Sequence, residues 1–260
     1  MPRALWTGAS GMAAQQTNVD LIANNIANVN TTGFKRQRAD FQDLFYDTRV
    51  LPGARTGDAS QNPTGVQVGT GVHLVGTTRL FSDGSIEATG KDTDMAIAGE
   101  GFFRVSLPDG STAFTRAGDF RVDANGSLVT PDGYFLEPRI TVPDGATQVA
   151  VGETGTISAL VNNAVTTLGS LTLSRFRNPA GLAAIGRNLF RETDASGTAT
   201  EGAPGSTGFG ILRGGQLEKA NVEIVTELVN MIVAQRAYEM NSRSVRTADQ
   251  MLQAANELIR

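Results

Sequence analysis

Residues able to carry out acid–base, nucleophilic or metal chemistry are scarce in this 260-residue chain. It has no cysteine and one histidine, His73, so thiolate chemistry is excluded and a zinc site or Ser-His-Asp triad has little to build on. Asp92 and Asp94 could act as a carboxylate pair, but the run Lys-Asp-Thr-Asp around them is more typical of a turn. We therefore expect no catalytic, cofactor-binding or metal-binding residues, and a protein that is not an enzyme.

The composition of the chain excludes several further classes of protein. The formal net charge is −4, which argues against a nucleic-acid binder with a broad basic face. No apolar run reaches the roughly 18 residues of a membrane span. The amphipathic, Asn-rich stretch after Arg3 also lacks the pattern of a cleavable secretory signal. We expect no nucleic-acid partner and no direct membrane insertion.

The C-terminal stretch from Asn221 carries a strict seven-residue repeat of mostly apolar positions. Small or polar residues, among them Ala234 and Ala248, lie three places after the large ones. This pattern predicts a long helix that lies against another helix. We expect the large positions, with Leu228 beside them, to form subunit contacts; they are Ile224, Met231, Tyr238, Val245, Leu252 and Ile259.

The N-terminal stretch shows the same period with almost no charge. Between Ala4 and Thr32 the only ionisable side chain is Asp20. A helix without charges on any face suits burial among several neighbours, although a core helix of a single globular domain remains an alternative. Because Asn is a poor helix former, we expect both ends to fold fully only on assembly. The expected contact positions are Leu5, Met12, Val19, Ile22, Ile26 and Val29.

The middle of the chain changes to a period of two. From Val72 to about Phe176, short runs of β-forming residues alternate with Asp-Gly and Asn-Gly pairs, which favour two-residue hairpin turns. This predicts an all-β domain, either a sandwich or a barrel-like fold. The turn pairs are Asp83-Gly84, Asp109-Gly110, Asn125-Gly126, Asp132-Gly133 and Asp144-Gly145.

Two segments join the first helix to the β region. The basic run at residues 34–38 is expected to be a solvated helix-end segment. Residues 47–71 combine low hydrophobicity with many Gly and Pro residues, which indicates a long loop or an extended arm that reaches a neighbouring subunit.

The predicted fold class is therefore α+β. Long N- and C-terminal helices form an α-helical coiled-coil domain from residues 1–45 and 215–260. They bracket an inserted all-β domain at 72–214, with an extended arm or linker at 46–71.

Two stretches resemble the terminal signatures of the bacterial flagellar rod and hook family. One is Ser-Gly-Met at 10–12 with Ala-Asn-Asn-Ile-Ala-Asn-Val-Asn-Thr-Thr-Gly-Phe-Lys at 23–35. The other is Glu-Leu-Val-Asn-Met-Ile-Val-Ala-Gln-Arg-Ala-Tyr-Glu at 227–239 with Ala-Asp-Gln-Met-Leu at 248–252. The chain length and three internal stretches, 67–72, 99–103 and 128–134, resemble the distal-rod branch of that family.

The resemblance implies a structural subunit of the basal-body rod that crosses the periplasm. In such proteins the terminal helices form the inner tube of a straight, rigid, hollow drive shaft, and an arm at about 46–65 accompanies straightness. The implied partners are other copies of the chain in a helical homopolymer, proximal rod proteins, the hook protein, the surrounding P- and L-ring proteins, and the type III export apparatus.

Two alternatives stay open. A proximal rod or hook-type axial subunit would share the terminal signatures. A β-rich extracytoplasmic hydrolase is a more distant alternative, because it needs a convergent carboxylate or metal site.

Overall fold

The computed structural model describes residues 2–53 and 62–258 and divides the chain into two compact units. The first unit consists of Met1–Ile26, Gln37–Thr78 and Glu223–Arg260. The second unit consists of Ala27–Arg36 and Arg79–Val222. The chain therefore enters and leaves the second unit twice.

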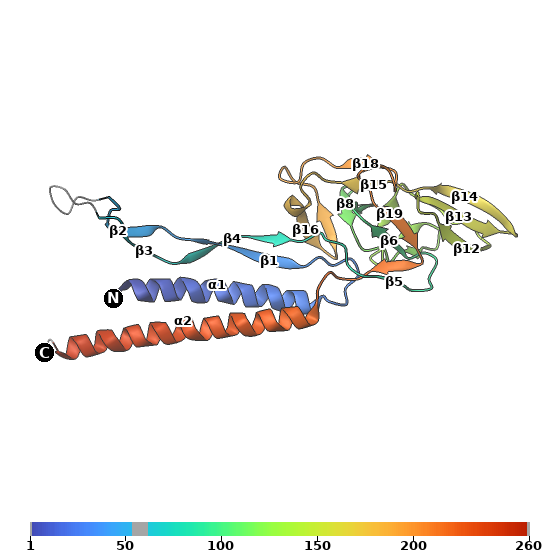
Figure 1. The fold of residues 1–260 in the computed structure, drawn as a ribbon. Coiled ribbons are helices and arrows are strands. Elements are labelled where there is room, and N and C mark those ends of the chain that lie inside the picture. Colours follow the sequence, from blue (N-terminus) through green and yellow to red (C-terminus); the bar gives the residue numbers. More distant parts are fainter. Residues whose placement is uncertain (1, 54–61, 259–260) are drawn as a thin grey trace. The chain divides into compact units, whose positions relative to one another are not determined.

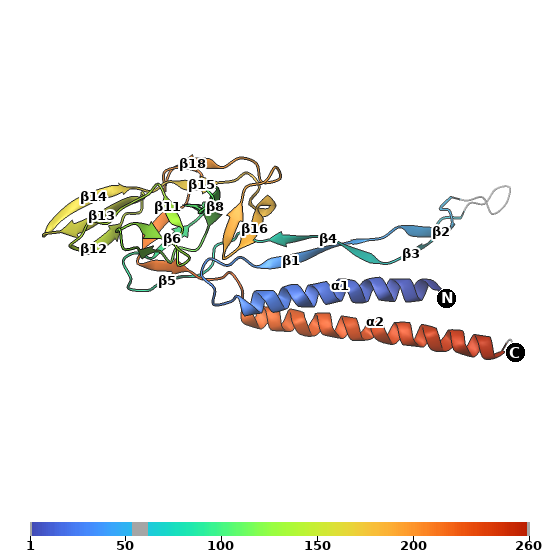
Figure 2. The same ribbon diagram turned by 180° about the vertical axis from the view of Figure 1, so that it is seen from behind.

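Two long helices form the main part of the first unit. Helix α1 (Pro2–Ala27) and helix α2 (Ile224–Leu258) lie side by side with opposite chain directions (Figures 1 and 2). Glu227 lies in the first turn of α2, where a negative charge complements the positive end of the helix dipole. In the described part of the chain, neither helix is long and apolar enough to cross a membrane.

The first unit also contains a narrow β-ribbon. Strand β1 (Gln37–Asp43) pairs with β4 (Val72–Arg79), and β2 (Tyr46–Val50) pairs antiparallel with β3 (Val66–Gly69). The ribbon is tied to α1, because the Val72 amide donates a hydrogen bond to the Ser10 hydroxyl at 3.3 Å.

The second unit is built from short strands and one 3₁₀ turn, η1 (Pro179–Gly181). Its strands are β5 (Ile86–Ala88), β6 (Met95–Ala98), β7 (Phe103–Ser106), β8 (Thr112–Thr115), β9 (Arg121–Val122), β10 (Leu128–Val129), β11 (Phe135–Glu137), β12 (Ala146–Val151), β13 (Thr156–Val161), β14 (Ala164–Ser170), β15 (Leu173–Arg175), β16 (Ala183–Gly186), β17 (Leu189–Arg191), β18 (Thr200–Gly202), β19 (Ile211–Gly214) and β20 (Gln216–Glu218).

Antiparallel pairing organises these strands into several small sheets. The largest has the order β16-β17-β8-β7-β11-β10-β9, and a separate sheet has the order β12-β13-β14 (Figure 1). The remaining pairs are β15 with β18, β19 with β6, and β20 with β5.

The predicted hairpin turns are present at three places but have a different geometry. Gly110, Gly126 and Gly133 follow Asp or Asn in the turns β7–β8, β9–β10 and β10–β11, and their φ angles are +79°, +78° and +86°. Each glycine amide bonds the carbonyl three residues earlier, so the turn is a four-residue turn with glycine in the last position. The prediction of two-residue turns was wrong, because only the glycine adopts positive φ.

The core of the second unit is apolar and closely packed. Phe103 and Phe120 are fully buried and meet edge to face, with ring centroids 5.1 Å apart. A second cluster joins Phe102, Phe114 and Phe190 with neighbouring apolar residues. Burying a large apolar side chain contributes roughly 1.5–3 kcal/mol, so these clusters give the second unit its own source of stability.

The structure confirms the coarse prediction of an α+β chain. Helices occupy both ends of the chain, and the region between them is mostly β.

Candidate assembly surfaces

The residues considered as possible catalytic or metal-binding groups do not lie together in one site. His73 is exposed on β4. Asp92 accepts a hydrogen bond from the Val149 amide at 3.3 Å. Asp94 is 4% exposed and accepts hydrogen bonds from the Thr89 hydroxyl at 2.7 Å and the Lys91 ammonium at 3.2 Å. The two carboxylates therefore serve separate local contacts. Among the described residues, no group of three or more His, Cys, Asp or Glu side chains is placed to hold a metal ion.

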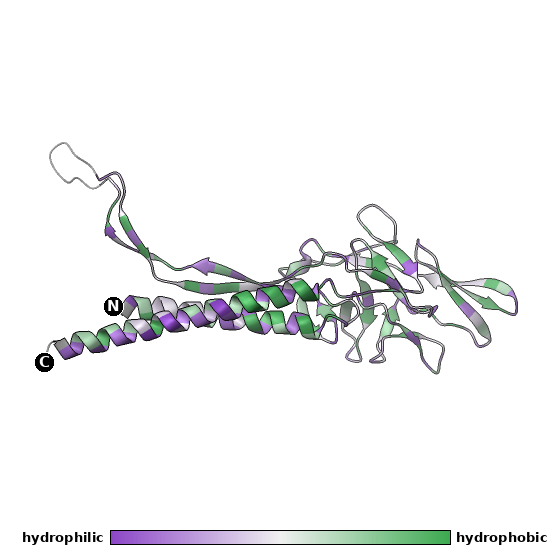
Figure 3. Cartoon of the chain, turned by 60° about the horizontal axis from the view of Figure 1, so that its bottom comes forward, coloured by the Kyte–Doolittle hydropathy of each residue, from purple (hydrophilic) through white to green (hydrophobic). Residues whose placement is uncertain are grey.

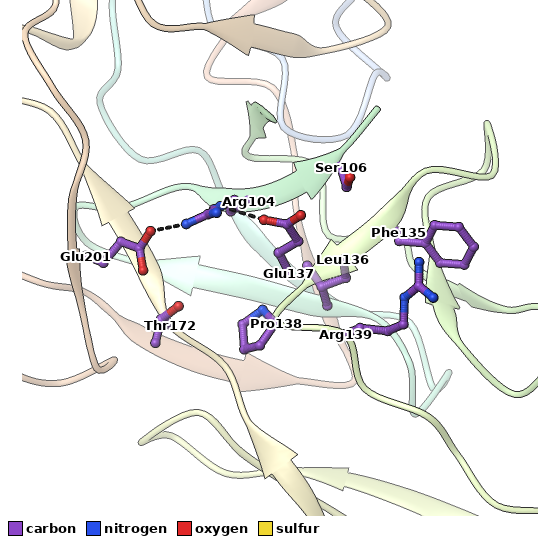
Figure 4. A pocket seen from close by; sticks show the side chains of 9 residues that line it. All are labelled: Arg104, Ser106, Phe135, Leu136, Glu137, Pro138, Arg139, Thr172 and Glu201. Atoms are coloured by element: carbon purple, nitrogen blue, oxygen red, sulfur yellow. Dashed lines mark hydrogen bonds and ion pairs between the residues drawn. The ribbon is translucent and has the colours of Figure 1, made fainter. Parts of the chain in front are cut away.

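An open pocket of about 460 Å³ lies over strands β7 and β11 (Figure 4). Arg104 lies between Glu137 and Glu201 and forms ion pairs with both, at 2.6 Å from Nε to Glu137. Beside them the Arg139 guanidinium lies 3.9 Å from the centre of the Phe135 ring. The charges of the pocket are thus balanced by contacts between its own strands.

A buried charge cluster occupies the second unit. The Lys35 ammonium lies 2.6 Å from both the Glu218 carboxylate and the Ser82 carbonyl, and the side chains of Lys35 and Glu218 are fully buried. Arg116, 2% exposed, approaches the other Glu218 oxygen at 3.3 Å and Asp83 at 2.7 Å. Burial lowers the pKa of Lys35, the Arg116 charge adds to that effect, and Glu218 opposes it.

This cluster corrects the expectation for the basic run at 34–38. Phe34 is 9% exposed and packs with Val29, Ala220 and Val222. Lys35 is 1% exposed. The first half of the run is therefore not solvated, because Phe34 and Lys35 contact groups far away in sequence, whereas Arg38 is exposed and pairs with the nearby Asp40.

The helix contact in the first unit is made by small residues. A Cβ atom on Gly8 would lie 2.6 Å from a Val245 methyl, and one on Gly11 would lie 2.7 Å from the Asn241 amide nitrogen. On α2 the buried positions are Glu227, Ala234 and Ala248. The residues three places after the large heptad positions therefore face α1.

The predicted contact positions on α1 are mostly half-buried in this chain, with only Ile22 buried. Val29 follows the end of α1 and packs in the second unit. On α2, Met231, Val245 and Leu252 are half-buried. Ile224 and Leu228 are each 46% exposed and Tyr238 is 40% exposed. Ile259 lies outside the described residues.

The first half of α2 exposes an apolar stripe. With roughly 3.6 residues per turn, it lies on the side of the helix opposite Glu227, Ala234 and Ala248. Figure 3 shows hydrophobic residues gathered where α1 ends and α2 begins. The stripe consists of Ile224 (46% exposed), Val225 (69%), Leu228 (46%), Val229 (53%), Ile232 (58%) and Val233 (62%). We call these residues the α2 stripe.

Sequence reasoning found only part of the α2 stripe. It selected Ile224 and Leu228 but missed the other four residues, because a seven-residue repeat follows only one narrow face of a helix; the four are Val225, Val229, Ile232 and Val233. The signal for the missed face is the pairing of apolar residues at positions i and i+1, repeated every four residues.

The β-ribbon carries a second exposed apolar group. Phe45 is 90% exposed, Leu51 is 66% exposed and Tyr46 is 56% exposed. Large apolar side chains with such exposure are candidates for contact with other molecules.

Models of known protein families match three stretches of the chain, one near each end and one in the β region. A model described as flagella basal body rod protein matches residues 5–35. A model of the flagellar hook protein FlgE/F/G D1 domain matches residues 96–159, and one of the flagellar basal body rod FlgEFG protein C-terminal region matches residues 213–258.

Full-length relatives agree with these models. The chain is 50% identical over 264 residues to the flagellar basal-body rod protein FlgG of Borreliella burgdorferi, covering 100% of both chains. It is 49% identical over 259 residues to the FlgG of Caulobacter vibrioides, covering 98% of this chain and 99% of that one. The flagellar hook protein FlgE of Helicobacter mustelae is 49% identical over 140 residues, which is 53% of this chain and 30% of the hook protein. The chain therefore belongs to the flagellar basal-body rod protein family, as a structural component of the bacterial flagellum basal body and not an enzyme.

Proposed function

We propose that this chain is the subunit of the distal rod. Copies stack head to tail along a helical path, a contact that does not close on itself. They form a straight, rigid, hollow drive shaft that transmits torque from the motor to the hook. The observation that carries the assembly step is the α2 stripe, an apolar surface that no other part of the described chain covers.

The α2 stripe favours other copies of the chain as its occupant. One side of α2 already packs against α1 through small residues, so a helix at the opposite side adds a further layer of helices. Helix α1 has no acidic residue in its first turn and no basic residue in its last turn, and between Ala4 and its end the only ionisable side chain is Asp20. A helix with so few charges suits a tube wall in which each helix has several neighbours.

We assign a separate role in the assembly to each part of the chain. Residues 1–45 and 215–260 form the inner tube through coiled-coil contacts that include the predicted interface positions. Residues 72–214 form the outer domain, and residues 46–71 form an arm that braces a neighbouring copy. The exposed Tyr46 and Leu51 support this role for the arm.

The proposed partners are those of an axial subunit: proximal rod proteins, the hook protein, the P- and L-ring proteins around the rod, and the type III export apparatus. The family names of the relatives support contacts with other rod and hook components.

A hook-type subunit is the second candidate, and the match to a hook protein is the observation that favours it. That match covers 53% of this chain, whereas the rod proteins match 98–100% of it. The rod assignment is therefore the better supported one.

Replacing stripe residues by aspartate tests the proposal. Val229→Asp together with Ile232→Asp places charges where we expect apolar contacts between copies, and burying an unpaired charge costs several kcal/mol. Since about 1.4 kcal/mol changes an equilibrium tenfold, we expect more than a tenfold loss of this subunit from isolated basal bodies and a loss of motility.

The matched control is Val165→Asp on β14, which changes another exposed valine (76% exposed) in the second unit. It should assemble normally. Normal assembly of the Val229→Asp and Ile232→Asp chain, at parental levels, would show that the α2 stripe is not an interface.

A further inference from the structure

We infer that Gly71 lets the β-ribbon dock on α1, and that this docking directs the arm. All the residues involved belong to the first unit. Gly71 lies between β3 and β4, and Leu44 lies between β1 and β2. The Leu44 amide donates a hydrogen bond to the Gly71 carbonyl at 2.8 Å. These two residues therefore form the joint at which the ribbon passes from one strand pair to the next.

Helix α1 offers three polar side chains to this joint. They occupy positions i, i+4 and i+7, which lie on one side of a helix, and they are Arg3, Thr7 and Ser10. Arg3 forms an ion pair with Asp47. The Thr7 hydroxyl donates to the Thr70 carbonyl at 3.3 Å, and the Ser10 hydroxyl accepts from the Val72 amide at 3.3 Å. We call these three contacts the α1 anchor.

The α1 anchor leaves no room for a side chain on Gly71. A Cβ there would collide with the Ser10 hydroxyl and lie 3.3 Å from the Ser10 Cβ. The φ angle of Gly71 is +138°, which favours glycine. Gly69 has neither restriction, because a Cβ there would meet only the Tyr46 ring, at an ordinary 3.6 Å. Close approach to α1 therefore explains why position 71 needs glycine and position 69 does not.

The polar contacts of the α1 anchor are individually weak. The side chains of Arg3 and Asp47 are 52% and 35% exposed, and exposed ion pairs contribute little. Both hydrogen bonds are long at 3.3 Å. The three contacts form together only when the ribbon backbone reaches the surface of α1. A single methyl group at position 71 holds the backbone away and disrupts all three at once.

The ribbon depends on α1 because a two-stranded ribbon is at best marginally stable by itself in water. A second attachment lies towards the other end of α1, where the Asn25 amide pairs with the Gln37 backbone through two hydrogen bonds of 2.9 Å. Asn25 is roughly 22 Å along the helix from Ser10. The Asn25 contact therefore fixes where the ribbon begins, and the α1 anchor fixes the direction in which β2 and β3 carry the arm.

Gly71→Ala tests the inference, with Gly69→Ala as the matched control. Hydrogen exchange in isolated basal bodies is followed at the Leu44 and Thr70 amides, whose acceptors are ribbon carbonyls that neither substitution removes. We expect Gly71→Ala to accelerate their exchange more than tenfold, because the released ribbon frays. Gly69→Ala should change it less than about twofold. Equal exchange in the two variants would overturn the inference, since something other than docking on α1 would then hold the ribbon.

A second comparison separates the contact with Ser10 from backbone strain. Ser10→Gly removes the atoms that the new methyl group would meet and leaves the strain at position 71 in place. We expect Gly71→Ala to accelerate exchange at least about twofold less in this background than in the parent. Equal acceleration in both backgrounds would rule out the close approach to α1 as the cause.

A milder variant covers the case in which the Gly71→Ala chain does not enter basal bodies. Ser10→Ala removes the acceptor of the Val72 amide and keeps the helix intact. We expect exchange at Leu44 and Thr70 to become at least about twofold faster. Unchanged exchange in this variant would count against the α1 anchor in the same way.

The link from the α1 anchor to rod shape rests on the proposed function. Electron micrographs of basal bodies compare Gly71→Ala, Gly69→Ala and a chain that lacks residues 46–65. We expect curved or less stiff rods from the first and the third, and straight rods from Gly69→Ala. Straight Gly71→Ala rods beside curved rods of the shortened chain would overturn the role of the anchor in directing the arm. Straight rods from all three would instead contradict the proposed role of the arm, while hydrogen exchange still decides whether the ribbon docks on α1.

Discussion

At the scale of single residues, the buried charges of the second unit depend strongly on one another. Glu218 is the carboxylate that both Lys35 and Arg116 approach, and it also accepts a hydrogen bond from the Gly84 amide at 2.9 Å. Such a cluster contributes little net stability over an apolar core, but removing one member leaves uncompensated buried charge. The stability of the β domain should therefore be sensitive to Glu218 in particular.

Glu218→Gln is expected to destabilise the β domain by about 3–5 kcal/mol, because two buried cations lose their shared anion. Adding Lys35→Met should recover part of the loss, since Arg116 still has Asp83. Urea unfolding followed by circular dichroism measures both effects. The control is Glu153→Gln, which breaks an exposed pair with Arg213 and should cost less than about 1 kcal/mol. Equal costs for the two substitutions would contradict this account of the cluster.

Asp119 makes the stability of the β domain depend on pH. Burial raises the pKa of Asp119 above its ordinary 3.8, and the nearby Asp94 carboxylate adds to this, while Lys91 and Arg121 oppose it. Between 3.8 and the raised pKa the folded state binds more protons than the unfolded state, so this contribution to stability is present at low pH and lost as pH rises through the folded pKa.

Asp119→Asn should therefore stabilise the chain near neutral pH, by less than about 1 kcal/mol because the group is partly exposed. The gain should shrink as pH falls towards about 4. Urea midpoints at both pH values check this. A gain that does not change with pH would rule out titration of Asp119 as its cause.

At the scale of elements, the hairpin turns need glycine for its backbone. Gly110 has a φ of +79° and open space around the position of a Cβ, so a substitution there tests backbone strain without steric contacts. An L-residue in the left-handed region costs roughly 1–2 kcal/mol, and Asn tolerates it better than Ala.

Gly110→Ala should lower the stability of the β domain by about 1–2 kcal/mol, and Gly110→Asn should lower it by less. The two urea midpoints give the comparison at one site. Identical losses for the two variants would mean that side-chain packing, and not φ, determines the cost.

Local patterns in the sequence predict the elements but not their partners. Each heptad repeat and each Asp-Gly or Asn-Gly pair is a pattern among residues that are close together in the sequence. The helices and several turns could therefore be predicted. Lys35 and Glu218 are 183 residues apart, and no local pattern links them. The face of α2 that meets α1 could not be chosen either, because the repeat places large residues on one side and small residues beside them. The interface positions of the assembly stay a prediction.

At the scale of the whole molecule, the arm is the part that distinguishes a straight rod from a bendable hook in the proposed function. Residues 46–53 and 62–65 of the arm lie in or beside β2 and β3, and residues 54–61 lie outside the described structure. Deleting residues 46–65 should give a rod that is curved or less stiff in electron micrographs of basal bodies. A Gly-Ser replacement of equal length separates the role of the residues from that of chain length. Straight rods from both variants would remove the arm from this role.

The central claim is that the α2 stripe is covered by other copies of the chain. Hydrogen exchange of residues 224–233, compared between dilute full-length protein and isolated basal bodies, tests it most directly. We predict fast exchange in dilute solution, with residues of the β domain protected in the same sample, and at least about a hundredfold slower exchange of 224–233 in the assembled rod. Equal protection of these residues in dilute protein and in basal bodies would contradict the claim, because the start of α2 would then be stable without a neighbour.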